Sequence, residues 1–300
     1  MRDGVTELVE LDAALQSVRR LDIRGWTVEW PGGEGWIGGI GPMTVVGRDL
    51  MLVVPTMSDG AVVYAVTKIV EDDWHATEPW APDRPGRSIW GLPLPGIRLQ
   101  AERFFGLSEP LMASVGHRAY LLTFLEEELG LFELTPSPRR LEAFPAGFSR
   151  SPPLPASEGR EGTAANYALL ESSKLPRGLY SRGAFLYLLT REPAPEGTRW
   201  RLHQIDPAAD RLLHSMTLPT GANHIFLVPG AERWAIVEKG PVVAAGQQAI
   251  PSAVLVPSAW IEDPESKGLD EPLACTPVAP ALAEPAVALE SPPEPAHLDP

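Results

Sequence analysis

The stretch AFLYLLTREPAPEGTRWRLHQIDPAADRLLHSMTL, residues 184–218, decides the fold. Its runs 184–191, 199–205 and 211–218 are rich in apolar and aromatic residues, and glycine, proline and aspartate lie between them. Short apolar runs bounded by such residues are typical of antiparallel strands. The segment Asp206–Asp210 (DPAAD) supplies a proline-containing turn between the second and third runs. This stretch therefore predicts a three-stranded meander.

The same pattern fills most of the chain between Trp26 and Trp260. Runs 48–56 and 61–70 flank an Asp-Gly pair, which is a strong hairpin signal. Two further pairs of runs, 117–125 with 129–135 and 224–228 with 233–238, flank short polar turns. We expect an all-β chain.

One segment near the start has helical spacing instead. Within residues 6–20, the apolar positions Leu8, Leu11, Leu15 and Val18 recur every three or four residues. Acidic residues open the segment and Arg19 and Arg20 close it, which suits the dipole of a helix. The spacing predicts one amphipathic N-terminal helix.

Four hairpin-like segments also resemble one another. Each has a short strand, a turn containing glycine and a more apolar second strand, and the turn residues are Gly47, Gly116, Gly183 and Gly230. These glycines are 69, 67 and 47 residues apart. The last spacing is near the roughly 40–50 residues of one β-propeller blade, and the longer ones require either strands hidden in proline-rich stretches or insertions. The repeats predict a β-propeller-like array of antiparallel meanders.

Two resemblances to known families support this expectation. Residues 205–237 resemble the repeat of the YVTN and quinoprotein-like propellers at Asp206, Leu213, Leu218, Gly221, Pro229, Gly230 and Val237, and depart from it at Ala231. That resemblance implies a fold and no activity. The predicted leader helix followed by the tryptophan-rich segment Gly25–Trp36 is similar to the propeller-like component encoded beside a MoxR-type AAA ATPase and a von Willebrand A protein in bacteria. This second resemblance implies an AAA ATPase or a von Willebrand A protein as partner.

Composition excludes several classes of function. The chain of 300 residues has a net charge of −14, which argues against binding nucleic acid through a basic surface. Its single cysteine, Cys275, excludes an intrachain disulfide and a cysteine-based zinc cluster. No apolar run approaches the roughly 18 residues that span a membrane, and the mixed-charge start differs from a secretory signal. We expect a soluble, cytoplasmic protein that binds neither membrane nor nucleic acid.

Charge and proline are unevenly spread, and they divide the chain into three parts. Residues 262–300 hold nine of the 33 prolines and nine acidic residues but one lysine, so this part is predicted to be a disordered acidic tail. Residues 1–25 form the predicted helix and its lead-in, and residues 26–261 form the propeller-like domain. A second proline-rich segment, 148–162, is predicted to be a surface loop within that domain.

Candidate binding residues lie in two irregular segments. Trp74, Trp80 and Trp90 occur among prolines and charges in residues 74–95, where burial is hard to arrange. Exposed aromatic side chains are typical of protein-binding surfaces. Pro152 and Pro155, in the loop 148–162, fit an extended proline-rich ligand pattern. These five residues are the candidate partner-binding set.

A metal site is the alternative. His203 and His214 lie on adjacent predicted strands, and His224 follows them in the chain. If the pairing register sets the first two imidazoles on one face, they could share a zinc or iron ion, whereas a slip of one residue would separate them. The favoured interpretation is a non-catalytic protein-interaction scaffold of a bacterial-type cytoplasmic multi-protein system, without cofactor. The alternative is a metal-dependent propeller enzyme of the hydrolase or lactonase kind that uses the three histidines.

Overall fold

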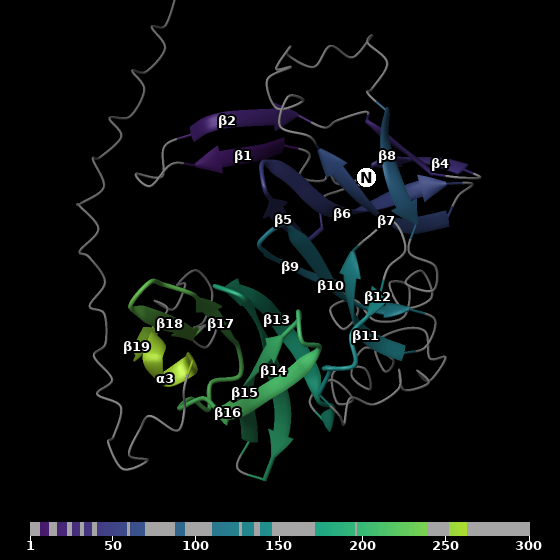
Figure 1. Ribbon diagram of the computed structural model, residues 1–300. Coiled ribbons are helices and arrows are strands. Elements are labelled where there is room, and N and C mark those ends of the chain that lie inside the picture. The colour runs from purple at the N-terminus through teal and green to yellow at the C-terminus, as the bar shows by residue number, and fades with distance from the viewer. Residues whose placement is uncertain are drawn as a thin grey trace, which may run out of the picture.

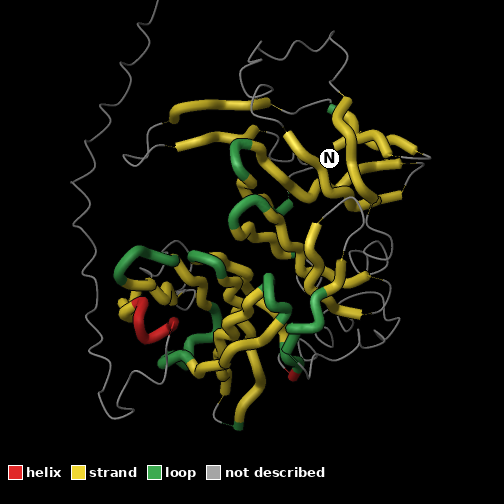
Figure 2. The backbone as a smooth tube through the Cα atoms, viewed as in Figure 1, coloured by secondary structure: helices red, strands yellow, loops and turns green. Residues whose placement is uncertain are grey.

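The computed structural model is built mainly of strands (Figures 1 and 2). The helix α3 (Ser258–Glu262) has five residues. No helix among the described residues is long and apolar enough to cross a bilayer. The prediction of an all-β fold is confirmed. The structure describes residues 7–11, 17–22, 26–30, 33–37, 41–58, 61–69, 88–93, 110–125, 128–134, 139–145, 172–195, 197–238 and 252–262.

Two four-stranded antiparallel sheets form the middle of the described chain. The first has the order β12-β11-β10-β9 and comprises β9 (Leu111–Val115), β10 (Arg118–Leu125), β11 (Glu128–Leu134) and β12 (Arg139–Arg140). The second has the order β13-β14-β15-β16 and comprises β13 (Leu175–Arg182), β14 (Phe185–Ala194), β15 (Gly197–Asp206) and β16 (Arg211–Thr217). Strands β14, β15 and β16 are the meander predicted from residues 184–218, which is confirmed.

A three-stranded antiparallel sheet follows, and we call it the last sheet. Its order is β17-β18-β19, with β17 (Ile225–Val228), β18 (Arg233–Glu238) and β19 (Ser252–Pro257). Helix α3 continues directly from β19. Because Ile261 of this helix is fully buried in the cluster beneath the last sheet, the folded part of the chain reaches α3. Apart from Glu262, which ends α3, the predicted acidic tail 262–300 lies outside the described residues.

Three of the four recurring glycines make the same tight turn. Gly47, Gly116 and Gly183 have φ angles of +66°, +59° and +58°, and each is the first of two residues that join paired strands. A glycine at this position is the signature of a type II′ hairpin turn, because a side chain would be strained there. The turn at Gly230 is longer, since Val228 pairs with Ala235. The sequence therefore located all four hairpins correctly.

The N-terminal sheet differs from a four-stranded blade. It has six strands in the order β4-β3-β8-β7-β6-β5, and β4 also pairs with β6, so the sheet curls until five of its strands close on themselves. Strands β3 and β8 pair in parallel, which the pattern of hairpins did not predict. The strands are β3 (Thr27–Trp30), β4 (Gly33–Ile37), β5 (Met43–Val46), β6 (Asp49–Ser58), β7 (Ala61–Ile69) and β8 (Ser88–Pro93).

The predicted N-terminal helix is wrong. Residues of that segment form a two-stranded antiparallel hairpin, β1 (Glu7–Leu11) and β2 (Ser17–Asp22). The backbone pairing sets Glu10 opposite Arg19. Leu8 is buried in the core cluster of the N-terminal sheet, so packing against that sheet overrides the weaker preference of an isolated helix.

The sheets stack in chain order and curve around the first strands of the four hairpins (Figure 1). Strand β9 lies beside β5 and β13, and β13 lies beside β17. Separate apolar clusters join each sheet to the next, as shown by the pairs Val53 and Met112, Leu122 and Leu186, and Leu202 and Ile236, whose members share a cluster. Successive residues of β14, Leu188 and Leu189, enter different clusters, as expected when both faces of a sheet are covered. The fold is propeller-like.

Two hydrogen bonds link the first strands across sheets. Thr44 Oγ1 of β5 donates to Ser114 Oγ of β9 at 3.0 Å. The backbone N–H of Leu227 in β17 donates to the hydroxyl of Tyr180 in β13 at 3.1 Å. Each of the two longer intervals between the turn glycines therefore corresponds to one sheet with additional residues. One strand, β8, does lie within the proline-rich stretch, while most of the remaining additional chain lies outside the described residues.

Candidate functional site

The register of β15 against β16 sets the two strand histidines apart. A β-bulge between Gln204 and Ile205 makes His203 pair with Ser215 and Gln204 pair with His214. Without that bulge, the turn would place His203 directly opposite His214. Because successive residues of a strand point to opposite faces, the slip of one residue turns the two imidazoles to opposite sides of the sheet.

His203 is buried in a polar cluster within the sheet. Its Nε2 lies 3.0 Å from Thr190 Oγ1, and its Nδ1 lies 2.6 Å from Ser215 Oγ. Burial, and then the nearby charges of Lys174 and Arg201, lower the pKa of His203 from 6.5 to about 4. An imidazole with so low a pKa is a weak base at neutral pH. The Ser215–His203 contact therefore favours a structural role.

The other two histidines lie elsewhere. Nε2 of His214 is 3.1 Å from the backbone oxygen of Ile261, so this ring joins β16 to helix α3. His224 is exposed just before β17. Within the described ranges, no three His, Cys, Asp or Glu side chains are grouped in a way that could hold a metal ion. The structure does not bring the three predicted ligands together.

The predicted partner-binding residues are placed only in part. Trp74, Trp80, Pro152 and Pro155 lie outside the described residues. Trp90 belongs to β8, where its backbone pairs with Glu29 of β3. A binding role for these residues stays a prediction.

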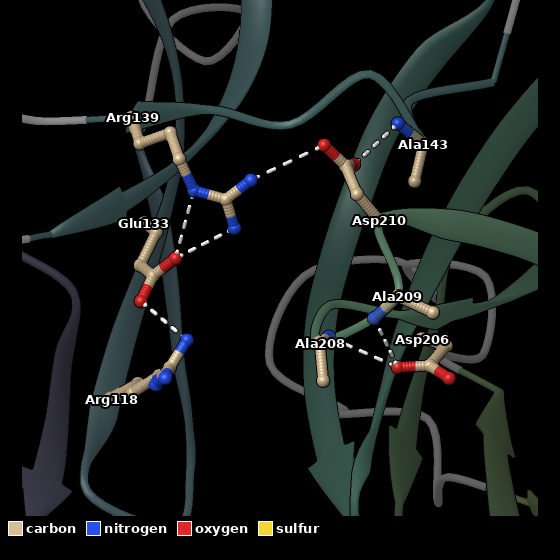
Figure 3. A network of polar contacts seen from close by, with 8 residues as sticks. All are labelled: Arg118, Glu133, Arg139, Ala143, Asp206, Ala208, Ala209 and Asp210. Carbon is tan, nitrogen blue, oxygen red and sulfur yellow. Dashed lines mark hydrogen bonds and ion pairs between the residues drawn. The ribbon is translucent and has the colours of Figure 1, made fainter.

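A buried carboxylate organises the sheet of β9–β12 (Figure 3). Glu133 is 5% exposed and accepts hydrogen bonds from Arg118 Nη1 at 2.9 Å and from Arg139 Nη2 at 2.8 Å. Nε of Arg139 donates to the same carboxylate oxygen at 3.1 Å. Two guanidinium groups thus satisfy one buried negative charge, as buried carboxylates require.

Arg139 and Asp210 connect this sheet to the next one (Figure 3). Nη1 of Arg139 lies 3.3 Å from Asp210 Oδ2, and the backbone N–H of Ala143 donates to Asp210 Oδ1 at 2.9 Å. Asp210 has a φ of +50°, which aspartate tolerates better than most residues. Asp206 shapes the same turn by accepting the N–H groups of Ala208 and Ala209 at 3.0 Å. This network holds the two sheets together.

Arg182, at the end of β13, binds the turn of the last sheet. Its guanidinium donates to the backbone oxygens of Gly230 and Ala231 and to Ser258 Oγ. Its Nε also lies 2.7 Å from Glu262 Oε1. One side chain therefore joins β13, the β17–β18 turn and helix α3.

We expect Arg182→Met to lower the free energy of unfolding by about 1–2 kcal/mol, because partly buried acceptors lose their donor. The loss should appear as faster amide hydrogen exchange in β17 and β18. Arg118→Met is the matched control, since Arg139 still pairs with Glu133 there. Equal exchange rates in the last sheet of both variants would contradict this role of Arg182.

The last sheet presents an apolar face to solvent, which we call the outer face. Its members come from alternate positions of the three strands and are Phe226, Val228, Ala235, Val237, Ala253 and Leu255. Phe226 and Val228 are 51% and 49% exposed, and the other four are half-buried. The opposite face, which includes Trp234, packs against β13–β16. None of the six belongs to a hydrophobic cluster of the described residues.

The outer face includes none of the tryptophans and prolines predicted from the sequence to bind a partner. A signal was present, because the strands at 225–228 and 252–257 are apolar at nearly every position rather than at alternate ones. Continuous apolar runs indicate a strand whose two faces both meet apolar surroundings. In β17 and β19 the second face has no such partner among the described residues.

Comparisons with known proteins add little to this description. No protein-family model and no curated protein matches the chain. Among solved structures, it is similar to the β-propeller domain of the trilobed protease from Pyrococcus furiosus, described as having an open velcro topology, with a TM-score of 0.38 and 6% identity. The alignment covers 72% of this chain and 53% of that one, so the chain spans about half the length of that relative. The chain's own sheets and clusters identify it as an all-β protein with a propeller-like stack.

Proposed function

We propose that this protein is a non-catalytic interaction scaffold whose binding surface is the outer face of the last sheet. The observation that carries the proposal is an apolar sheet face, two of whose side chains, Phe226 and Val228, are about half exposed. Contiguous exposed apolar patches are typical of protein-binding surfaces, and aromatic residues supply much of their binding energy.

The stacking of the sheets supports this proposal. Apolar clusters fill the space between each described sheet and the next, and the outer face is the next surface in the same series. Covering Phe226 and Val228 would remove apolar area that is exposed in the single chain. At about 25 cal/mol per Å² of buried apolar area, each side chain would contribute on the order of 1 kcal/mol. An apolar face of another protein is the ligand that this surface suits.

The proposed partners are proteins of a bacterial multi-protein system. An AAA ATPase or a von Willebrand A protein is the first candidate, from the resemblance of the segment Gly25–Trp36, which includes β3 and β4. The leader helix, the other half of that resemblance, is replaced by the β1–β2 hairpin. The choice between candidate partners therefore depends on the experiment.

Affinity capture from the native host with three versions of the full chain tests the proposal. The versions are the wild type, the double variant Phe226→Glu/Val228→Glu, and Leu212→Glu. Leu212 is a suitable control because it is 36% exposed on β16, away from the outer face. We expect the wild type and the control to retain the same proteins and the double variant to lose them, at least tenfold by quantitative mass spectrometry.

Unchanged melting temperatures of the three versions would show that folding is intact. If the double variant retains the same set of proteins as the wild type, the outer face is not the binding surface. If no version retains any protein above background, the scaffold function itself is contradicted.

A further inference from the structure

We propose that the outer face binds a second copy of this chain, face to face, about a two-fold axis that runs across the strands of the last sheet. This inference rests on the proposed function, because the second copy would cover the same surface and would compete there with a partner of another kind. It follows from the order of the six side chains in the sheet and from the position of the nearest charge.

The six side chains form two rows across the sheet. The pairing register places Phe226, Val237 and Ala253 in one row. It places Val228, Ala235 and Leu255 in the other. Each strand therefore contributes a larger residue to one row and a smaller residue to the other row.

A two-fold axis that lies midway between the two rows and runs perpendicular to the strands would exchange the rows. Each row then lies over the other row of the second copy, so that Phe226 faces Val228, Val237 faces Ala235, and Leu255 faces Ala253. In all three pairs a larger side chain meets a smaller one, which allows the two faces to interdigitate at the spacing of about 10 Å between packed sheets. The face is thus complementary to itself, as a two-fold interface requires.

Among the described residues of this face, the nearest charged side chain favours the same axis. Arg233 is exposed and lies on β18 two residues before Ala235, on the same face of the sheet. An axis across the strands keeps the two copies of Arg233 at opposite ends of the interface. An axis along β18 would set the two guanidinium groups over each other, and like charges in such contact are unfavourable.

The size of the face predicts a weak dimer. Three strands about 4.8 Å apart and about five residues long cover roughly 250 Å² on each copy. A standard stable complex buries about 800 Å² on each partner. The association should therefore be weaker than that of a standard complex and should depend on local concentration.

Sedimentation equilibrium of the full chain between about 10 µM and 500 µM tests the dimer. We expect the mean mass of the wild type and of Leu212→Glu to rise towards that of a dimer. Phe226→Glu alone and Val228→Lys alone should each associate at least tenfold more weakly. An equimolar mixture of these two variants should recover association, because the carboxylate introduced in one copy would then face the ammonium group introduced in the other, while the second Phe–Val contact remains intact.

Each other outcome overturns the proposal. A dimer that the single variants leave unchanged uses another surface, and a mixture that fails to recover association contradicts the axis. Stronger association of the chain ending at residue 262 would show that residues 263–300 occupy the face in the full chain. A monomeric wild type excludes the second copy. In that case, the capture experiment still distinguishes a surface for another protein from a failure of the scaffold function.

Discussion

Trp200→Ala is expected to lower the free energy of unfolding by about 3–5 kcal/mol, the usual cost of removing a large aromatic side chain from a core. Trp200 is 1% exposed and lies in the cluster between β13–β16 and the last sheet. Its Nε1 also donates a hydrogen bond to the backbone oxygen of Ala222 at 2.6 Å. Urea denaturation followed by circular dichroism measures the change, and a loss below about 1.5 kcal/mol would contradict this role.

Two phenylalanine variants separate the contribution of packing from that of the hydrogen bond. Trp234 is also fully buried, with its ring 5.0 Å from that of Tyr187, but its Nε1 has no hydrogen-bond partner among the described residues. Trp200→Phe removes an indole N–H together with its hydrogen bond, whereas Trp234→Phe removes a buried indole N–H that has no hydrogen-bond partner among the described residues. We therefore expect Trp200→Phe to be the more destabilising by about 1 kcal/mol. The reverse order would show that packing differences outweigh the hydrogen bond.

The stability of the protein is expected to fall between pH 6.5 and pH 4 because of His203. Its pKa is about 4 in the folded chain, while an imidazole in the unfolded chain has a pKa near 6.5. Below pH 6.5 the unfolded chain therefore binds a proton that the folded chain does not, and acidification favours unfolding. The contribution present above pH 6.5 is lost progressively until about pH 4, and it amounts to about 3 kcal/mol.

The variant His203→Gln isolates this effect from the titration of carboxylates. Glutamine retains groups that can bond to Thr190 and Ser215, but it does not titrate. From pH 7 to pH 4, we expect the free energy of unfolding of the wild type to fall by about 3 kcal/mol relative to that of the variant. Denaturant curves at intervals of half a pH unit measure this difference, and parallel curves for the two proteins would contradict a buried neutral imidazole.

Most local features of the fold could be predicted from the sequence. Apolar runs bounded by glycine, proline and aspartate predicted the hairpins, because turn residues and strand preference act over a few neighbouring residues. Gly47, Gly116 and Gly183 marked their turns because a positive φ strongly favours glycine. The segment 6–20 failed because its spacing suits a helix while its contacts with the N-terminal sheet stabilise two strands.

The candidate site was less predictable. His203 and His214 stand in positions that a regular hairpin would pair, and one bulged residue in β16 turns them apart. No rule of spacing locates such a bulge, because its position depends on what packs against both strands. Trp74, Trp80, Pro152 and Pro155 lie outside the described residues, so the predicted binding segments stay predictions.

The sequence by itself determined that this chain forms antiparallel hairpins, where their turns lie and that they recur. Only the tertiary structure decided that the N-terminal sheet curls on itself, that His203 is buried as a neutral ring, and that the outer face of the last sheet has no covering sheet among the described residues. The physical reason is distance along the chain. A turn depends on adjacent residues, whereas the covering of a sheet face depends on segments tens of residues away whose contacts form together.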